Sequence, residues 1–133
     1  MTDWTVTGIT APPWPRPPAA LPHGRLDEPP GGAWVTVAGL VLLRQRPGTA
    51  KGVIFLTLED ETGTCNVVIW AKIYEKYRRA VIAGRLLRVT GRLQREAGVV
   101  HVVAHKIEDL SPLLDRLLNP GFRPDGHRAA DQP

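Results

Sequence analysis

The segment from Val53 to Trp70 constrains the fold more than any other part of the chain, because two alternating apolar runs flank a short polar sequence at 60–63. This pattern predicts a β-hairpin, in which successive side chains turn to opposite faces of each strand. One face carries Ile54, Leu56, Leu58, Cys65, Val67 and Ile69. The other carries Phe55, Thr57, Glu59, Asn66, Val68 and Trp70. The first set is therefore predicted to fill a core, and the second to face outward.

The segments on either side of this hairpin predict further strands and two helices. Residues 33–46 form a long apolar run interrupted by Gly39, and a glycine inside a strand marks a bulge or a bend. Residues 71–84 change to a helical period, with an apolar stripe through Ile73, Tyr77 and Val81. Residues 85–94 and 99–110 predict a second hairpin, and residues 111–118 a short helix with Ser111 as its N-cap.

Three strands, a helix and two strands, in this order, are the layout of an OB-fold. We therefore expect a mainly β fold, with a five-stranded OB barrel over residues 33–110 and a helix between its third and fourth strands. Eight of the thirteen prolines precede residue 31. Because proline fixes φ and removes a backbone donor, residues 1–32 are expected to be a Pro-rich disordered arm or linker. Residues 111–133 are expected to be a short helix followed by a disordered tail.

The distribution of charge indicates the class of partner. The chain carries a net charge of +4, but residues 44–95 alone hold eleven basic and four acidic residues. This basic centre either meets a polyanion, since phosphate contacts supply most nonspecific affinity, or forms a solvated basic surface. The chain has no apolar run long enough to span a bilayer and a single cysteine. We therefore expect a soluble, cytoplasmic protein with no membrane partner.

The outward face of the first hairpin suits a ligand with flat rings and hydrogen-bonding edges, such as a nucleic acid base. Phe55 is predicted to stack on a base, unless the N-terminal segment or a partner covers it. Thr57 and Asn66 offer a hydroxyl and an amide on the same face, where Asn66 either reads a base or holds the turn. Five basic residues are predicted to bind phosphates or to keep the surface solvated: Arg44, Arg46, Lys51, Arg88 and Arg92.

Other chemistry-bearing residues do not form a predicted site. Asp60 belongs to a turn, where aspartate bonds backbone amides, so the acidic run 59–61 is not predicted to hold a metal. His101 and His105 lack a third ligand, and Cys65 lies on the apolar face without a paired base. We therefore predict no catalytic residue, no metal and no cofactor.

The residues also resemble a known family. Residues 35–118, and above all RQRPGTAKG (44–52) and FLTLEDETG (55–63), resemble the C-terminal OB domain of bacterial error-prone DNA polymerases, of the replicative alpha-subunit family. One departure is His105-Lys106, where an acid followed by a base is expected. A weaker resemblance links the hairpin to the anticodon-binding OB domains of class II aminoacyl-tRNA synthetases, in which an amide at the place of Asn66 reads a base.

The resemblance implies a module that binds single-stranded DNA in damage-induced translesion synthesis, without polymerase activity in this chain alone. Two alternatives stay open. One is a protein-interaction OB domain that tethers polymerase accessory factors, and the other is an anticodon-type module that binds RNA.

Overall fold

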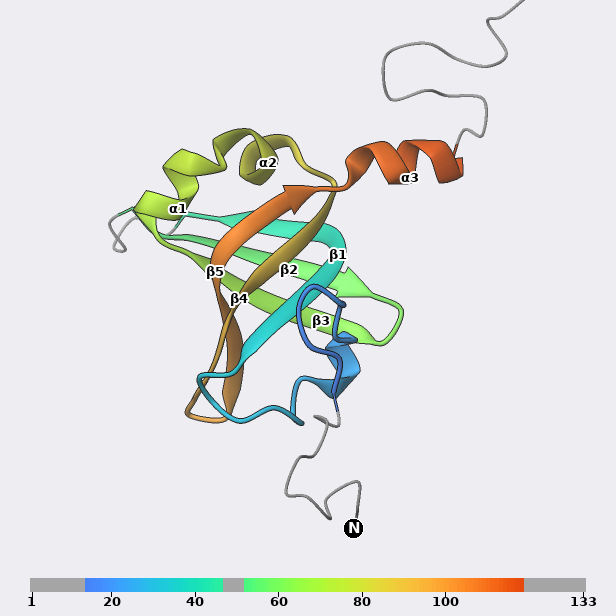
Figure 1. Ribbon diagram of the computed structural model, residues 1–133. Helices are drawn as coiled ribbons and strands as arrows, with labels where there is room; N and C mark the ends of the chain where they lie inside the picture. The colour runs from blue at the N-terminus through green and yellow to red at the C-terminus, as the bar shows by residue number, and fades with distance from the viewer. Residues whose placement is uncertain (1–13, 47–51, 119–133) are drawn as a thin grey trace, which may run out of the picture.

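The computed structural model describes residues 14–46 and 52–118, and its strands form a closed barrel (Figure 1). The strands are β1 (Trp34–Gln45), β2 (Ile54–Asp60), β3 (Gly63–Ile69), β4 (Leu86–Glu96) and β5 (Val99–Asp109). The helices are α1 (Ala71–Lys76), α2 (Arg78–Ala83) and α3 (Ser111–Leu118), and a 3-10 turn, η1, covers His23–Arg25. The predicted mainly β OB-fold, with its short C-terminal helix, is confirmed. The predicted tail after residue 118 lies outside the described residues.

The strands are neighbours in the order β1-β2-β3-β5-β4, and β4 pairs back with β1. The pairing of β3 with β5 is parallel, and the other four pairings are antiparallel. Every described strand therefore has a neighbour on both sides along at least part of its length, and closure removes most of the exposed edge that an open sheet would have.

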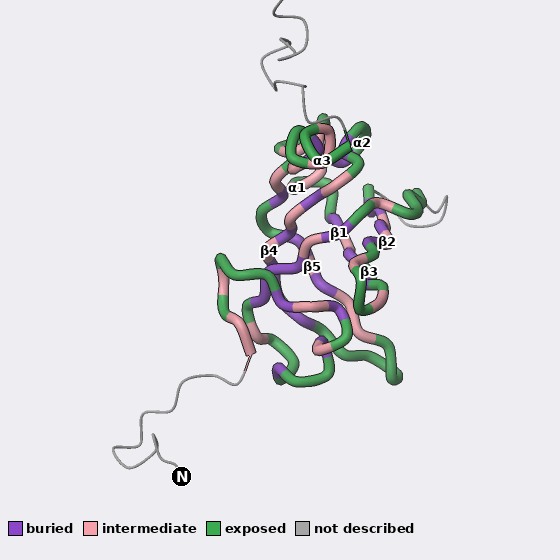
Figure 2. Tube along the Cα trace, turned by 90° about the vertical axis from the view of Figure 1, so that its right-hand side faces the viewer, coloured by how far each residue is buried: buried purple, intermediate pink, exposed green. Residues whose placement is uncertain are grey.

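The barrel interior contains the residues that the hairpin pattern assigned to it. All six predicted inward residues of β2 and β3 are buried. Figure 2 shows buried segments alternating with more exposed ones along the strands. They pack with Val35 and Val37 of β1 and with Leu87, Val89 and Leu93 of β4. Burial raises the pKa of the Cys65 thiol to about 12, with a further contribution from the charge of Asp60. The thiol therefore stays protonated at neutral pH and acts as a small apolar side chain.

The helical segment after β3 covers one end of the barrel (Figure 1). The single helix that the sequence predicts is two short helices, because Tyr77 leaves helical geometry with φ −118° and ψ 30°. Tyr74 and Tyr77 pack against the core, and Val81 is buried, so the apolar stripe does face the barrel. Within residues 14–46 and 52–118, no helix combines the length and apolar character needed to cross a bilayer.

Two glycines allow strands to approach closely where the barrel bends. A Cβ atom on Gly39 would lie 2.6 Å from the backbone oxygen of Glu59, and one on Gly91 would lie 2.0 Å from that of Val103. Both contacts are shorter than van der Waals separation, so a side chain at either position forces the backbone apart. The register of β1 against β2 shifts between Val41 and Leu43, so the bulge lies just beyond the glycine at which the sequence predicts a bulge or bend.

Residues 14–32 differ from the disordered arm that their proline content predicts. They pack at the end of the barrel opposite α1 and α2 (Figure 1), with Leu21 and Leu26 in the core. The Leu21 N–H donates to the Thr36 carbonyl at 2.7 Å, and the Arg95 guanidinium donates to the Leu26 carbonyl at 2.9 Å. Proline prevents a helix or a central strand, but it does not prevent an extended segment from burying the leucines between the prolines. Residues 1–13 lie outside the described residues.

The turn between β2 and β3 fastens this N-terminal segment. The Asp60 carboxylate accepts hydrogen bonds from the backbone N–H groups of Thr62 (2.7 Å), Gly63 (3.0 Å) and His23 (2.9 Å). The Gly24 N–H donates to the Thr62 hydroxyl at 2.8 Å. The prediction that Asp60 bonds turn amides is confirmed, and the same carboxylate also holds η1.

Ser111 differs from its predicted role as a helix cap. Its hydroxyl accepts hydrogen bonds from the N–H groups of Arg85 (2.8 Å) and Leu86 (3.4 Å) at the start of β4. Asp109 instead accepts from the Ser111 N–H at 2.9 Å, and Arg85 forms an ion pair with Asp115 at 2.7 Å. These contacts attach the first turns of α3 to the barrel.

Replacing Leu56 with alanine should lower the free energy of unfolding by about 2–5 kcal/mol, because Leu56 is buried and its loss leaves a cavity. Urea unfolding measures the change. Thr57→Ala, at the next position on the outer face, is the control and should shift stability far less. Equal losses in the two variants would contradict the assignment of faces.

The hydrogen bonds of the Asp60 carboxylate predict that the free energy of unfolding depends on pH. Burial raises the pKa of Asp60, but the hydrogen bonds from Thr62 and His23 and the charge of His23 outweigh it and hold the pKa below its ordinary value. The carboxylate therefore contributes stability above the ordinary aspartate pKa of about 3.9, and this contribution is lost as pH falls through the lower folded-state pKa.

Asp60→Asn should remove this part of the pH dependence, whereas Asp27→Asn, at an exposed position of the N-terminal segment, should keep it. Urea unfolding of the three proteins between about pH 7 and about pH 3 measures the difference. A wild-type slope that persists in Asp60→Asn would show that another group causes it.

Candidate nucleic-acid interface

Strand register brings the predicted side chains of β2 and β3 together in two rows across the outer face. In the first row, the strand partners are Gln45, Phe55, Val68, Val103, Arg92 and Trp34. In the second row, they are Leu43, Thr57, Asn66, His101 and Gln94. Because strands lie about 4.8 Å apart, each row offers successive side chains at a spacing that a nucleic acid strand can follow.

Phe55, Thr57 and Asn66 form the centre of this face. Phe55 and Thr57 are partly exposed, and Asn66 is exposed. The Thr57 hydroxyl donates to the Asn66 side-chain oxygen at 3.5 Å, which is long for a hydrogen bond. The Asn66 amide N–H groups donate to no other described residue, so they are available to an acceptor on a ligand. The structure therefore brings the predicted ring, hydroxyl and amide to one surface.

Arg46 lies at the end of β1, beside the first row. Its guanidinium lies 5.0 Å from the centre of the Tyr74 ring, and that of Arg78 lies 5.6 Å from the same centre. Two cations on one ring form a basic cluster beside the end of β1, made of Arg46, Arg78 and Tyr74, which we call the Arg46 cluster. It borders a hollow of about 200 Å³ that Gln45 and Ile54 also line. Lys51, predicted to act with Arg46, lies outside the described residues.

Arg44 points elsewhere, although the sequence groups it with Arg46. Its guanidinium donates to the carbonyl of Val81, at 2.7 Å, and to that of Gly84. The bulge in β1 is the cause, because it pairs Arg44 with the inward residue Leu56 and turns Gln45 to the outer face. In this structure Arg44 therefore binds the carboxyl end of α2.

Arg88 and Arg92 lie on β4, and each has a partner within the fold. The Arg88 guanidinium donates to the Glu108 carboxylate, and this hydrogen bond holds the pKa of Glu108 below its usual value. Arg92 lies over Trp34, 4.6 Å from the ring centre, and His105 meets the same ring edge-on at 4.7 Å. Arg92 thus belongs to a second basic and aromatic group on the outer face, which we call the Trp34 cluster.

The sequence analysis does not assign Trp34, Tyr74 or Arg78 to the candidate interface, although the structure places them there. The signal for Trp34 was present, because period-two alternation with the buried Val35 and Val37 turns it outward. Tyr74 lies beside the apolar stripe of the helical segment and packs on the core. Its contacts with two arginines depend on how the helix crosses the end of β1, which no local pattern encodes.

The acidic run 59–61 lies at the turn end of the same hairpin. Glu59 pairs with Thr64 and with Leu40, one row beyond Thr57 and Asn66. Across residues 14–46 and 52–118, no three His, Cys, Asp or Glu side chains gather as metal ligands. The outer face therefore changes from aromatic and basic at one end to acidic at the other.

The family whose pattern describes this arrangement is the OB-fold nucleic acid binding domain, which matches residues 35–110. The chain belongs to this family. It is 62% identical over 103 residues to an error-prone DNA polymerase of Ruegeria pomeroyi, an alignment that covers 77% of the chain and 9% of that polymerase. It is 60% identical over 86 residues to error-prone DNA polymerase 1 of Rhizobium meliloti, covering 65% of the chain and 8% of the polymerase. The matched OB domain is thus under a tenth of the length of these relatives.

Solved structures give the same fold. The OB domain resembles part of asparaginyl-tRNA synthetase from Pyrococcus horikoshii, with a TM-score of 0.52 and 28% identity over 60% of the chain and 19% of the synthetase. It also resembles a chain of the Stn1-Ten1 complex of S. pombe, with a TM-score of 0.50 and 21% identity over 64% of this chain and 63% of that one. The second likeness shows the fold alone.

Alanine substitutions of Arg44 and Arg46 should have different effects on stability and on oligonucleotide binding. Arg44→Ala should lower the melting temperature, because two helix-end carbonyls lose their donor. Arg46→Ala should leave melting nearly unchanged but weaken oligonucleotide binding and reduce the salt slope by about 0.7, the value for one phosphate on a single strand. Melting curves and salt titrations of both variants test this. An unchanged melting temperature in Arg44→Ala would contradict the structural role.

Proposed function

We propose that this OB domain binds single-stranded DNA across the outer face of β2 and β3. The observation that carries the proposal is the grouping of Phe55 with Thr57 and Asn66, between the Arg46 cluster and the Trp34 cluster. A ring that stacks on a base contributes about 1–3 kcal/mol without regard to sequence, and the amide and hydroxyl meet base edges.

Basic residues at both ends of the first row indicate how the DNA strand lies on the protein. Arg46 and Arg78 attract phosphates at one end of the first row, and Arg92 attracts them at the other. Arg44, Lys51 and Arg88 belong to the same predicted phosphate-binding set, although Arg44 and Arg88 are already engaged within the fold. Glu59 repels phosphate from the turn end of the hairpin. We therefore expect the DNA strand to run along the rows, across β2, β3 and β5, and not toward the β2–β3 turn.

The identity with error-prone DNA polymerases supports a role in damage-induced translesion synthesis, where a module that holds the template strand assists a catalytic region. Because the chain matches under a tenth of those polymerases, we propose that it has no polymerase activity alone. Primer extension by the purified chain would contradict this. A single, buried cysteine supports a reducing cytoplasmic setting.

RNA is the second candidate ligand, because the OB domain shares 28% identity with a tRNA synthetase. Competition between DNA and RNA strands of equal length and sequence separates the two. A DNA-binding site should prefer DNA or treat both alike, whereas contacts to the 2′-hydroxyl favour RNA. A strong preference for RNA would make the RNA-binding function the better assignment.

Phe55→Ala should weaken binding of a single-stranded oligonucleotide by about tenfold or more and leave the salt slope unchanged, because stacking releases few counterions. Fluorescence anisotropy at several salt concentrations measures both quantities. Val103→Ala, an apolar truncation in the same row but on β5, is the matched control and should have a smaller effect. Unchanged binding in Phe55→Ala would move the interface to another face.

A further inference from the structure

An apolar groove with an acidic rim lies at the bend of β1 around Gly39 and Leu40. Its floor contains Leu40 of β1 and Leu86 of β4, and α3 forms one wall with Leu114 and Leu117. This part encloses about 590 Å³. Leu40 is 40% exposed and Leu117 is 78% exposed, so aliphatic surface is open to solvent here.

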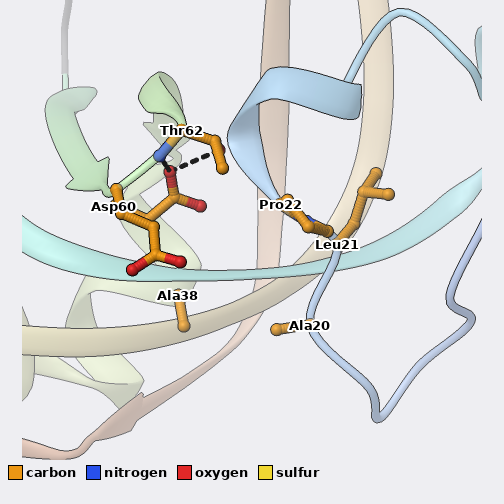
Figure 3. Close-up of a pocket in the computed structure, with 7 residues that line it drawn as sticks. Ala20, Leu21, Pro22, Ala38, Asp60 and Thr62 are labelled. Atoms are coloured by element: carbon orange, nitrogen blue, oxygen red, sulfur yellow. Dashed lines mark hydrogen bonds between the residues drawn. The ribbon is translucent and has the colours of Figure 1, made fainter.

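The groove extends beyond α3. A second hollow, of about 330 Å³, shares Ala38, Asp60 and Glu61 with the first, so the two adjoin. Figure 3 shows Asp60 and Thr62 on one side of this hollow and Leu21 and Pro22 on the other. The two hollows together form a trough from α3 to the N-terminal segment, which we call the acidic groove.

The rim determines which chemistry can enter. Glu59, Asp60 and Glu61 stand along one side, and neither glutamate forms an ion pair with a described residue. Two arginines of the chain near the start of β4 are paired, Arg85 with Asp115 and Arg88 with Glu108, so the three carboxylates of the rim outnumber Arg116 of α3. Phosphate is therefore repelled from this groove, whereas lysine or arginine side chains are attracted.

The backbone restricts the mode of docking. At Leu40, β1 pairs with Leu86 of β4 and with Glu59 of β2, so the backbone of the groove floor is already paired on both sides there. A partner binds this floor through its side chains, in the way that an amphipathic segment enters a groove. The walls are fixed, because Ser111 and Asp115 attach α3 to the start of β4.

We propose that the acidic groove binds a segment of a partner protein that carries leucine-like side chains and lysine or arginine residues. The apolar side chains of the partner lie on the four leucines, and its cations face Glu59 and Glu61. This site is separate from the DNA-binding face and does not depend on the function proposed for it.

A fluorescein-labelled peptide with leucines at helical spacing and lysines elsewhere tests the proposal with the full chain. It should bind, and its affinity should fall as salt rises, because the rim charges are screened. Peptides with serine in place of leucine, or glutamate in place of lysine, should bind at least about tenfold more weakly. Equal binding of the glutamate peptide would overturn the proposal.

Matched variants locate the site. Leu117→Ser should weaken the peptide about tenfold, whereas Leu113→Ser, an exposed leucine of the same helix outside the groove, should not. A Glu59→Lys and Glu61→Lys double variant should also lose binding, and Glu75→Lys on α1 should keep it. Single-stranded DNA should bind Leu117→Ser as it binds wild type. Equal peptide binding to wild type and Leu117→Ser would overturn the proposal.

Two further results identify a different occupant. Sedimentation that shows a dimer, dissociated by Leu117→Ser, would assign the groove to a second copy of the chain. A chain ended at Leu118 that binds the peptide about tenfold more tightly would assign it to residues 119–133. Either result overturns the partner proposal, and a monomer whose affinity is unchanged by truncation supports it.

Discussion

Strand β1 pairs with two strands at once, and the rest of the structure depends on this double pairing. Its first half pairs with β4 and its second half with β2, and Leu40 has a partner in each, Leu86 and Glu59. The strand must therefore bend sharply at 39–40, and Gly39 permits this because a Cβ atom there would meet the Glu59 backbone at 2.6 Å. This bend allows the barrel to close. In a closed barrel, alternate residues of each strand face the interior and the exterior.

The sequence predicts the fold and part of the candidate site wherever the information is local. Alternation along 53–70 correctly separates Leu56 and its buried neighbours from Phe55, Thr57 and Asn66, because a period of two needs only the strand itself. Arg44 shows the limit. Its side depends on the bulge after Val41, which reverses the alternation of β1, and no residue type marks that position. The packed N-terminal segment shows another limit, because burial of Leu21 depends on the distant β2–β3 turn rather than on the prolines around it.

The outer surface divides into two regions of opposite character. Aromatic and basic side chains gather at the two ends of the row through Phe55, on β1, α1 and β4, whereas leucines and acids gather where β1, α3 and the β2–β3 turn meet. Glu59 stands between them, opposite Leu40 and one row from Asn66. The two proposed ligands, single-stranded DNA and a basic peptide, have opposite charge, so each is expected to bind its own region without competing with the other. The net charge of +4 conceals this division, since it averages over both regions.

The β2–β3 hairpin contributes residues to both regions, and the N-terminal segment holds the tip of this hairpin in place. The outer face of β2 and β3 presents Phe55, and the tip of the same hairpin places Asp60 and Glu61 on the groove. Asp60 accepts hydrogen bonds from within the turn and from His23, and Gly24 donates to Thr62. A hairpin tip is ordinarily the most mobile part of a small barrel, but here a segment nearly forty residues earlier in the chain holds it. Loss of those contacts therefore changes the position of Asp60 and Glu61 at the groove directly. Phe55 lies near the other end of β2, so the same loss should change its position less.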